Sequence, residues 1–281
     1  MKVIESIKEL REQVREWRKQ ELSVGLVPTM GYLHEGHKSL IDRAVKENDR
    51  VVVSVFVNPM QFGVGEDLES YPRDMERDCQ LCENAGADVV FHPQPEEMYT
   101  KNFSSFVDMN TLTKGLCGKT RPIHFRGVCT VVSKLFNIVT PDRAYFGEKD
   151  AQQLAVIRHM VEDLNFGIEI VGCPIIREDD GLAKSSRNTY LSAVERKAAT
   201  VLNRSLQEAE NLYKNGERKS EVLTGAIRSY LDKEPLAKID YVELVDWNTL
   251  EPVEKAEGNI LIAIAVYIGK TRLIDNRIMA E

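Results

Sequence analysis

Two histidines three residues apart lie in the segment best suited to chemistry, Pro28-Thr29-Met30-Gly31-Tyr32-Leu33-His34-Glu35-Gly36-His37. Residues 24–27 predict a buried strand, and residues from about 36 to 47 predict a helix. The spacing of His34 and His37 brings both side chains to one helix face. Free backbone N–H groups and the positive end of the helix dipole at a helix start attract phosphate. We therefore expect a nucleotide-phosphate site that supports transfer at the phosphate.

The same pattern has a simpler interpretation, since two histidines near a helix start can be ordinary polar residues of the first turn. Two features favour a site. The motif lies in a strand-turn-helix context, as a phosphate site requires. In addition, Gly31 and Gly36 allow the backbone to approach a ligand closely.

Two neutral amides, Asn58 and Gln61, follow the β-branched run 51–57. Such a run predicts a strand buried on both faces. Amide groups at the exit of a strand can bind hydroxyl and carboxylate oxygens without adding charge. The alternative is a plain polar turn.

A further polar cluster follows the predicted strand 143–146, with Gly147, Glu148, Lys149 and Asp150 in succession. Lys149 is a candidate phosphate contact, and Asp150 could accept hydrogen bonds from ribose hydroxyls. Gln153 lies one turn into the helix that follows. The alternative is a charged helix N-terminus with an acidic cap.

The loop 177–190 carries the last cluster, with Lys184, Ser185, Ser186 and Arg187. These cations and hydroxyls could close over a polyphosphate. A solvated, charged linker is the alternative.

The elements that must position these clusters alternate between strand and helix. The expected strands are 24–28, 51–57, 87–91, 143–146 and 167–171, with a short candidate at Ser104–Met109, and the expected helices are 36–47, 74–85, 124–139 and 150–164. Repeated strand-helix-strand units predict a doubly wound parallel sheet. Ligands bind beyond the carboxyl ends of the strands of such sheets.

The pattern changes near residue 175. Helix patterns at 192–215 and 220–232 and strand patterns at 239–245 and 260–268 predict a smaller α+β unit. We therefore expect a first domain at 1–175 and a second at 176–281.

Composition limits the class of protein. The chain has 281 residues, 43% hydrophobic and 29% charged, with a net charge of −7. These values are ordinary for a soluble globular protein and argue against a general nucleic-acid or anionic-membrane surface. Residues 1–20 follow a charged, amphipathic helix pattern and lack the apolar region of a signal peptide, and no run is long enough to span a bilayer. We expect a cytoplasmic protein with small-molecule substrates.

The five cysteines give no zinc-site spacing. Cys79 and Cys82 form a C-x-x-C inside a helical pattern, and no second pair accompanies them. We expect free thiols without a structural metal.

The order of the motifs resembles the pantothenate synthetase family, ATP-dependent ligases of the nucleotidylyltransferase superfamily that join pantoate to β-alanine. The motifs that carry the resemblance span nearly the whole chain: Pro28-Thr29-Met30-Gly31 with His34-Glu35-Gly36-His37, Phe56-Val57-Asn58-Pro59-Met60-Gln61-Phe62, Tyr71-Pro72-Arg73, Arg121-Pro122 with His124-Phe125 and Gly127-Val128, Phe146-Gly147-Glu148-Lys149-Asp150 with Gln153, and Ser185-Ser186-Arg187-Asn188.

The resemblance implies a Rossmann-type domain, a smaller C-terminal lid, a homodimer and a reaction in two steps. Pantoate would attack the α-phosphate of ATP, and β-alanine would then attack the pantoyl adenylate. Mg²⁺ would accompany ATP through phosphate oxygens.

Residue roles follow from the same resemblance. His34, His37, Lys149 and Arg187 would be catalytic. Gln61, Gln153, Asn58 and Met30 would bind pantoate and β-alanine. ATP would be held by Pro28, Thr29, Met30, Gly31, Tyr32, Leu33, His34, Glu35, Gly36, His37, Gly147, Glu148, Lys149, Asp150, Ile176, Lys184, Ser185, Ser186 and Arg187.

The chain departs from the family pattern at two positions, with Lys184 in place of a common methionine and Ile123 in place of a common glycine. Two rival functions stay open at this point. One is an adenylyltransferase that stops after nucleotide transfer, and the other is a nucleotide-binding regulatory module without turnover. Gln61 and Gln153 favour an enzyme with an acyl acceptor over the first rival. The cluster of cations favours catalysis over the second.

Overall fold

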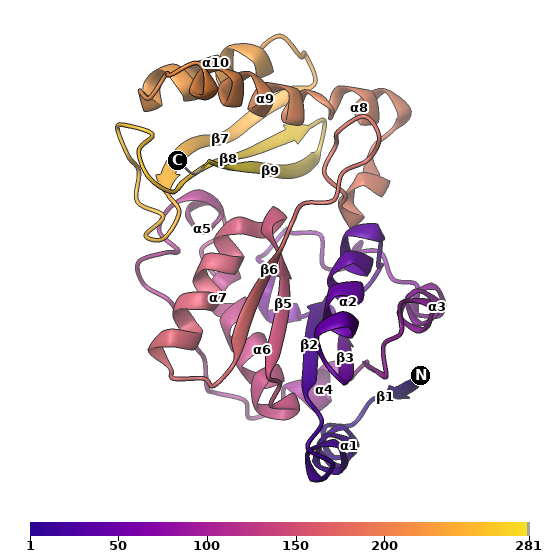
Figure 1. Cartoon of the computed structure of the whole chain (residues 1–281). Helices are drawn as coiled ribbons and strands as arrows, with labels where there is room; N and C mark the ends of the chain where they lie inside the picture. Colours follow the sequence, from indigo (N-terminus) through magenta and orange to yellow (C-terminus); the bar gives the residue numbers. More distant parts are fainter. Residues whose placement is uncertain (280–281) are drawn as a thin grey trace. The chain divides into compact units, whose positions relative to one another are not determined.

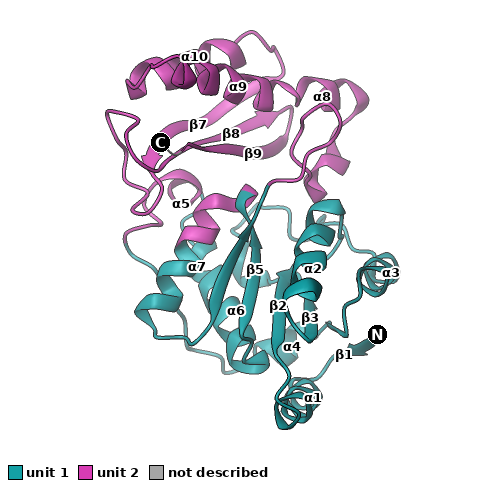
Figure 2. Ribbon diagram, in the orientation of Figure 1, with its two compact units in different colours: residues 1–110, 121–148, 156–174 teal, residues 111–120, 149–155, 175–281 magenta. Residues whose placement is uncertain are grey.

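The structure, a computed structural model, describes residues 1–279 of the chain (Figure 1). These residues form two compact units (Figure 2). Unit 1 contains residues 1–110, 121–148 and 156–174, and unit 2 contains residues 111–120, 149–155 and those from 175 onward. Unit 2 thus includes two short segments on the N-terminal side of the boundary expected near residue 175.

Unit 1 is built on a six-stranded, fully parallel sheet with the strand order β1-β4-β3-β2-β5-β6. Its strands are β1 (Lys2–Ile4), β2 (Val24–Thr29), β3 (Arg50–Val55), β4 (Val89–Phe91), β5 (Arg143–Gly147) and β6 (Glu169–Cys173). The central strand β3 is buried from Val51 to Val55, as its run of β-branched residues predicts. The predicted doubly wound α/β fold is confirmed.

Helices connect the strands of unit 1. They are α1 (Ile7–Lys19), α2 (Glu35–Glu47), α3 (Met75–Ala85), α4 (Pro95–Met98), α6 (His124–Val139) and α7 (Ala151–Asp163), with 3-10 turns η1 (Pro59–Gln61) and η2 (Glu148–Asp150). The last two residues of η2 and the first residues of α7, up to Ala155, belong to unit 2.

Both faces of the parallel sheet are covered. Leu40, Ile41 and Ala44 of α2 and Cys82 of α3 pack into one buried cluster with the valines of β3. Helix α6 packs against β2 and α1, and its Ser133 donates to the Met160 sulfur of α7 at 3.3 Å. Double-sided burial leaves the strand ends as the places where polar groups can meet a ligand.

Two expectations for unit 1 were wrong. Ser104–Met109 is not a strand, because the Val107 amide donates to the Thr130 hydroxyl of α6 at 3.0 Å, without a strand partner. The first residues, expected to be wholly helical, instead begin with β1, which pairs with β4.

Unit 2 contains a three-stranded antiparallel sheet covered by helices (Figure 2). Its strands are β7 (Ala237–Asp246), β8 (Ile260–Ile268) and β9 (Thr271–Met279), and its helical segments are α5 (Leu116–Thr120), η3 (Ser186–Tyr190), α8 (Ala193–Ala198), α9 (Val201–Lys214) and α10 (Ser220–Leu231). Apolar residues of α9, α10 and β8 form its core. The smaller α+β unit is thus confirmed.

The helix expected over 192–215 is in fact two helices, α8 and α9. They are separated at Ala199 and Thr200, where the Thr200 amide bonds the Lys197 carbonyl three residues back. Strand β9 was not anticipated. Within residues 1–279 no helix is long and apolar enough to cross a membrane.

Candidate functional site

The polar clusters of unit 1 lie at one edge of its parallel sheet. Strands β2, β3 and β5 are neighbours that run in the same direction. The segments that leave their carboxyl ends begin at Met30, Phe56 and Glu148. This edge is where an open α/β sheet binds its ligands.

The turn between β2 and α2 is held in an unusual backbone conformation. Gly31 has φ of 86° and Tyr32 has φ of 49°, both in the left-handed region. Glycine adopts such angles without a steric penalty, whereas tyrosine needs support from its surroundings. The Asp78 carboxylate on α3 supplies that support by accepting from the Tyr32 amide at 2.7 Å and the Leu33 amide at 2.6 Å.

Asp78 is itself almost fully buried, with 1% of its surface exposed. Burial raises the pKa of this carboxyl, and the hydrogen bonds from Leu33 and Tyr32 only partly oppose the shift. Asp78 is not among the residues predicted from the sequence, because only the fold brings it to a turn more than forty residues earlier in the chain.

His34 and His37 form a reciprocal cap at the N-terminus of α2. His34 is the N-cap, and its Nδ1 accepts from the Gly36 amide at 3.1 Å, while His37 Nδ1 accepts from the His34 amide at 3.3 Å. The ring centroids lie 4.1 Å apart. An accepting Nδ1 places the proton of a neutral imidazole on Nε2. Each neutral ring can therefore act as an N–H donor.

Three predicted substrate residues come together in unit 1. The Gln61 Nε2 atom donates to the Met30 sulfur at 2.8 Å, and the Asn58 Nδ2 atom donates to Gln61 Oε1 at 3.1 Å. Asn58 and Gln61 are buried, at 1% and 7% exposure. The turn after β2 and the turn after β3 therefore meet through neutral polar groups.

The backbone around Gln61 is held from α6. His124 Nδ1 lies 3.0 Å from the Gln61 carbonyl oxygen. A Cβ atom on Gly127 would overlap the backbone of Met60 and Gln61, so only glycine permits this approach. Ile123, which departs from the family pattern, has φ of −98° and ψ of −11°, a negative φ that does not require glycine.

An ion pair supports the same region. Arg121 Nε donates to Glu66 Oε1 at 2.9 Å, and Arg121 Nη2 reaches the Gln61 carbonyl oxygen at 3.4 Å. Burial of Glu66 opposes its ionisation, but Arg121 outweighs burial and lowers the pKa of this carboxyl. The motif Arg121-Pro122 thus has a structural role beside Gln61.

In unit 2, Lys149 and Asp150 lie at the start of α7. Lys149 Nζ is 3.7 Å from Asp150 Oδ2, and the Lys149 carbonyl accepts from Asn276 of β9 at 3.0 Å. Gln153 is half-buried in the first turn of α7. Its neighbour Gln152 is buried and donates to the Leu112 and Gly115 carbonyls.

Hydrogen bonds and ion pairs within unit 2 hold the segment that carries the serine cluster. The Lys184 amide bonds the Ile176 carbonyl at 2.9 Å, and Lys184 Nζ lies 3.2 Å from Glu178. Arg177 pairs with the buried Asp275 of β9 at 2.7 and 2.9 Å. Lys184 and Ile176 therefore come together within unit 2.

Two further members of this cluster lie at the start of η3. Ser185 caps η3 by accepting from the Arg187 amide at 3.3 Å. Ser186, which follows the cap, is buried. The cap places Ser185 and Arg187 next to Lys184 in unit 2.

The cysteines are not part of these polar clusters. The five thiols are free, and burial raises the pKa of Cys82 and of Cys129 to about 12. Across residues 1–279, no group of three His, Cys, Asp or Glu side chains is arranged to hold a metal.

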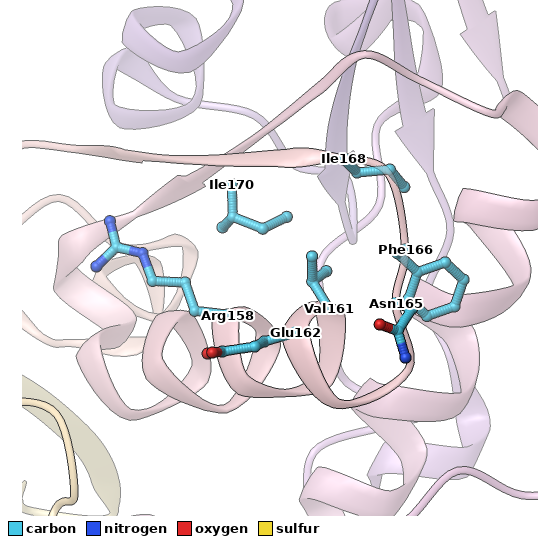
Figure 3. Close-up of a pocket in the computed structure, with 7 residues that line it drawn as sticks. All are labelled: Arg158, Val161, Glu162, Asn165, Phe166, Ile168 and Ile170. Carbon is cyan, nitrogen blue, oxygen red and sulfur yellow. The ribbon is translucent and has the colours of Figure 1, made fainter.

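A surface hollow in unit 1 lies away from the predicted residues (Figure 3). It is lined by Arg158, Val161, Glu162, Asn165, Phe166, Ile168 and Ile170. These residues belong to the end of α7, the turn after it and the start of β6, whereas the clusters above follow the carboxyl ends of the strands. The hollow contains none of the predicted site residues.

The parallel sheet, its glycine-containing strand-to-helix turn and the small second unit define an α/β protein of the Rossmann type. The family model described as pantoate-beta-alanine ligase matches residues 2–278. A pantothenate synthetase of Clostridium acetobutylicum is 62% identical over 98% of each chain.

Two solved structures agree. A Thermus thermophilus pantothenate synthetase is 46% identical, with a TM-score of 0.94 over 99% of each chain. A Francisella tularensis pantoate-beta-alanine ligase, complexed with beta-gamma ATP and beta-alanine, is 36% identical. Its TM-score is 0.81, over 99% of this chain and 97% of that one. The present chain belongs to the pantoate-β-alanine ligase family and is an enzyme of the ligase class.

Proposed function

We propose that this enzyme condenses pantoate with β-alanine to pantothenate, at the expense of ATP, through an enzyme-bound pantoyl adenylate. The observation that carries the proposal is in unit 1. The capped N-terminus of α2, with His34 and His37, adjoins a turn whose Met30 contacts Gln61. The histidines that would donate hydrogen bonds to phosphate and the neutral side chains that would bind the acid thus lie in neighbouring turns at the same edge of the sheet.

In the first step, the pantoate carboxylate attacks the α-phosphorus of ATP, and the bond to pyrophosphate breaks. Negative charge grows on the phosphate oxygens and on the leaving group. Preorganised donors stabilise such charge without a protein nucleophile. His34 and His37 donate from Nε2, and the helix N-terminus of α2 adds its dipole.

The family motifs supply the proposed ATP contacts. These are Pro28 to His37 with Gly147 and Glu148, Lys149 for phosphate, Asp150 for ribose, Ile176 near adenine, and Lys184, Ser185, Ser186 and Arg187 along the triphosphate. Mg²⁺ accompanies ATP, held by phosphate oxygens and water, as is common for this ion.

In the second step, the amine of β-alanine attacks the acyl carbon of the adenylate, and AMP leaves. Gln61 binds pantoate and β-alanine, and Gln153 binds pantoate. Neutral amides suit this task because they bind carboxylate and hydroxyl oxygens without neutralising the nucleophile. We further propose a cytoplasmic homodimer, as in the family that the sequence resembles.

Product analysis tests the proposal against its rivals. Enzyme with ATP, pantoate and β-alanine should form AMP, pyrophosphate and pantothenate in equal amounts. An enzyme that stops after nucleotide transfer would release pyrophosphate without pantothenate, and a regulatory module would leave ATP intact. Either result would contradict the proposal.

A further inference from the structure

A half-buried tyrosine outside every predicted cluster contacts one of the predicted substrate amides, Asn58. Tyr99, at the end of α4, donates from its hydroxyl to Asn58 Oδ1 at 2.8 Å. Its ring packs against Phe103, with centroids 4.9 Å apart, and lies 6.3 Å from Phe56. Burial raises the pKa of this phenol, so it stays a neutral hydrogen-bond donor.

The hydrogen bonds of Asn58 decide which way its amide points. Oδ1 accepts from the Tyr99 hydroxyl at 2.8 Å and from the Met60 amide at 3.3 Å. Nδ2 donates to Gln61 Oε1 and to the Gly127 carbonyl, both at 3.1 Å. All four positions of the amide are occupied, and a flipped amide would set its N–H against the Met60 N–H and its oxygen against the Gly127 carbonyl oxygen.

The orientation of Asn58 fixes that of Gln61. With Oε1 held by the Asn58 donor, the Nε2 group of Gln61 faces Met30, whose thioether is a weak acceptor. Nε2 carries two N–H groups, so this contact leaves donor capacity. Beside Met30, the Gln61 side chain therefore offers a ligand a hydrogen-bond donor and not an acceptor.

We propose that Tyr99 is a positioning residue that acts through Asn58 to make Gln61 present its N–H face to a carboxylate or hydroxyl oxygen of the acid substrate. This inference rests on the proposed function, since pantoate supplies the oxygen that Gln61 meets. Tyr99 itself touches no substrate in this arrangement.

The test compares two tyrosines whose hydroxyls make hydrogen bonds inside unit 1. Tyr99→Phe removes the hydroxyl and keeps the ring, which should raise the KM for pantoate about three- to tenfold and leave the KM for ATP unchanged. Tyr145→Phe is the control. Its hydroxyl likewise makes side-chain hydrogen bonds, accepting from Asn48 and donating to Glu47, but at the C-terminal end of α2. The control should lower the thermal midpoint similarly and leave both KM values alone.

A double-mutant cycle identifies the route of the effect. In the Asn58→Ala background, Tyr99→Phe should change the KM for pantoate no further, because the residue through which it acts is gone. The proposal is overturned by equal KM effects of the two tyrosine variants, by a pantoate KM of Tyr99→Phe within twofold of wild type, or by an undiminished effect in the Asn58→Ala background.

A second variant serves if Tyr99→Phe does not fold. Asn58→Asp places an acceptor oxygen against Gln61 Oε1 and should turn the Gln61 amide, so that its carbonyl faces the substrate. We expect pantoate binding to fall further than in Tyr99→Phe, with ATP binding retained, and unchanged pantoate binding would overturn the inference. Failure of the wild-type enzyme to form pantothenate would instead contradict the proposed function.

Discussion

The histidine pair shows how a short motif gains its chemistry from backbone hydrogen bonds. The spacing alone indicated that His34 and His37 share a face. The structure adds that each Nδ1 accepts a backbone amide at the helix start, which sets the tautomer of both rings. Hydrogen-bond partners of this kind cannot be read from residue types, because they depend on the conformation of the turn.

We expect His34→Ala or His37→Ala to lower the rate of pyrophosphate release about 10²- to 10³-fold, because each removes one preorganised donor. Loss of the His34 cap should also cost about 1 kcal/mol of stability. Presteady-state pyrophosphate release and thermal unfolding measure the two effects. His159→Ala on α7 is the control and should leave the rate unchanged; near-normal release from both site variants would contradict the role.

Lys184 is predicted to meet ATP phosphates through its charge. Lys184→Met, which restores the common family residue, should raise the KM for ATP about two- to fivefold at low salt. The difference between the two enzymes should shrink as salt screens the charge. Steady-state kinetics over a salt series checks this, and an identical KM for ATP at every salt concentration would count against a phosphate contact.

Among the secondary-structure elements, the pattern of apolar residues in the sequence predicted most of the helices and strands that pack through apolar contacts. The continuous run 51–57 predicted β3, and the pattern 124–139 predicted α6 with its bounds. Strand β9 escaped because three of its five buried positions, Thr271, Asp275 and Asn276, are polar. Asp275 is satisfied by Arg177 and Asn276 by the Lys149 carbonyl, partners that hydropathy does not reveal.

Helix α6 must lie directly on the turn that carries Gln61. Gly127→Ala should therefore lower the free energy of unfolding by about 1–3 kcal/mol and raise the KM for pantoate, because Met60 and Gln61 must move. Gly225→Ala in α10 is a matched helical control with open space around its Cβ. It should instead stabilise the protein by about 0.5–1 kcal/mol. Equal stability of the two variants would contradict the packing argument.

Helix α3 supports the turn between β2 and α2 through Asp78, whose raised pKa has a consequence for stability. The folded state binds this proton more tightly than the unfolded state, so ionisation costs stability as pH rises through the folded pKa. Asp78→Asn removes that dependence. The free energy of unfolding of wild type relative to Asp78→Asn should fall between pH 4 and neutrality, as measured by urea denaturation. A relative stability that rises with pH would mean that folding lowers the pKa of Asp78, which would contradict this prediction.

At the scale of the whole molecule, the assigned residues belong to two units. Unit 1 contains His34, His37 and Gln61, and unit 2 contains Lys149 and Arg187. The sequence placed a boundary near residue 175, whereas unit 2 also includes residues 111–120 and 149–155. Those segments could not be assigned from sequence, because they adjoin unit 1 along the chain and join the rest of unit 2 only through tertiary contacts, such as Asn276 with the Lys149 carbonyl and Tyr241 with Cys117.

In the proposed mechanism, pantoate is activated as an adenylate that is bound to the enzyme but not covalently attached. Because no protein nucleophile takes part in this mechanism, its first step is complete and reversible before the amine arrives. Isotope exchange from labelled pyrophosphate into ATP measures that step directly. The account predicts exchange with pantoate present and β-alanine absent, and no exchange without pantoate. Exchange that requires β-alanine, or labelled pantoate that stays attached to the denatured enzyme, would contradict the account.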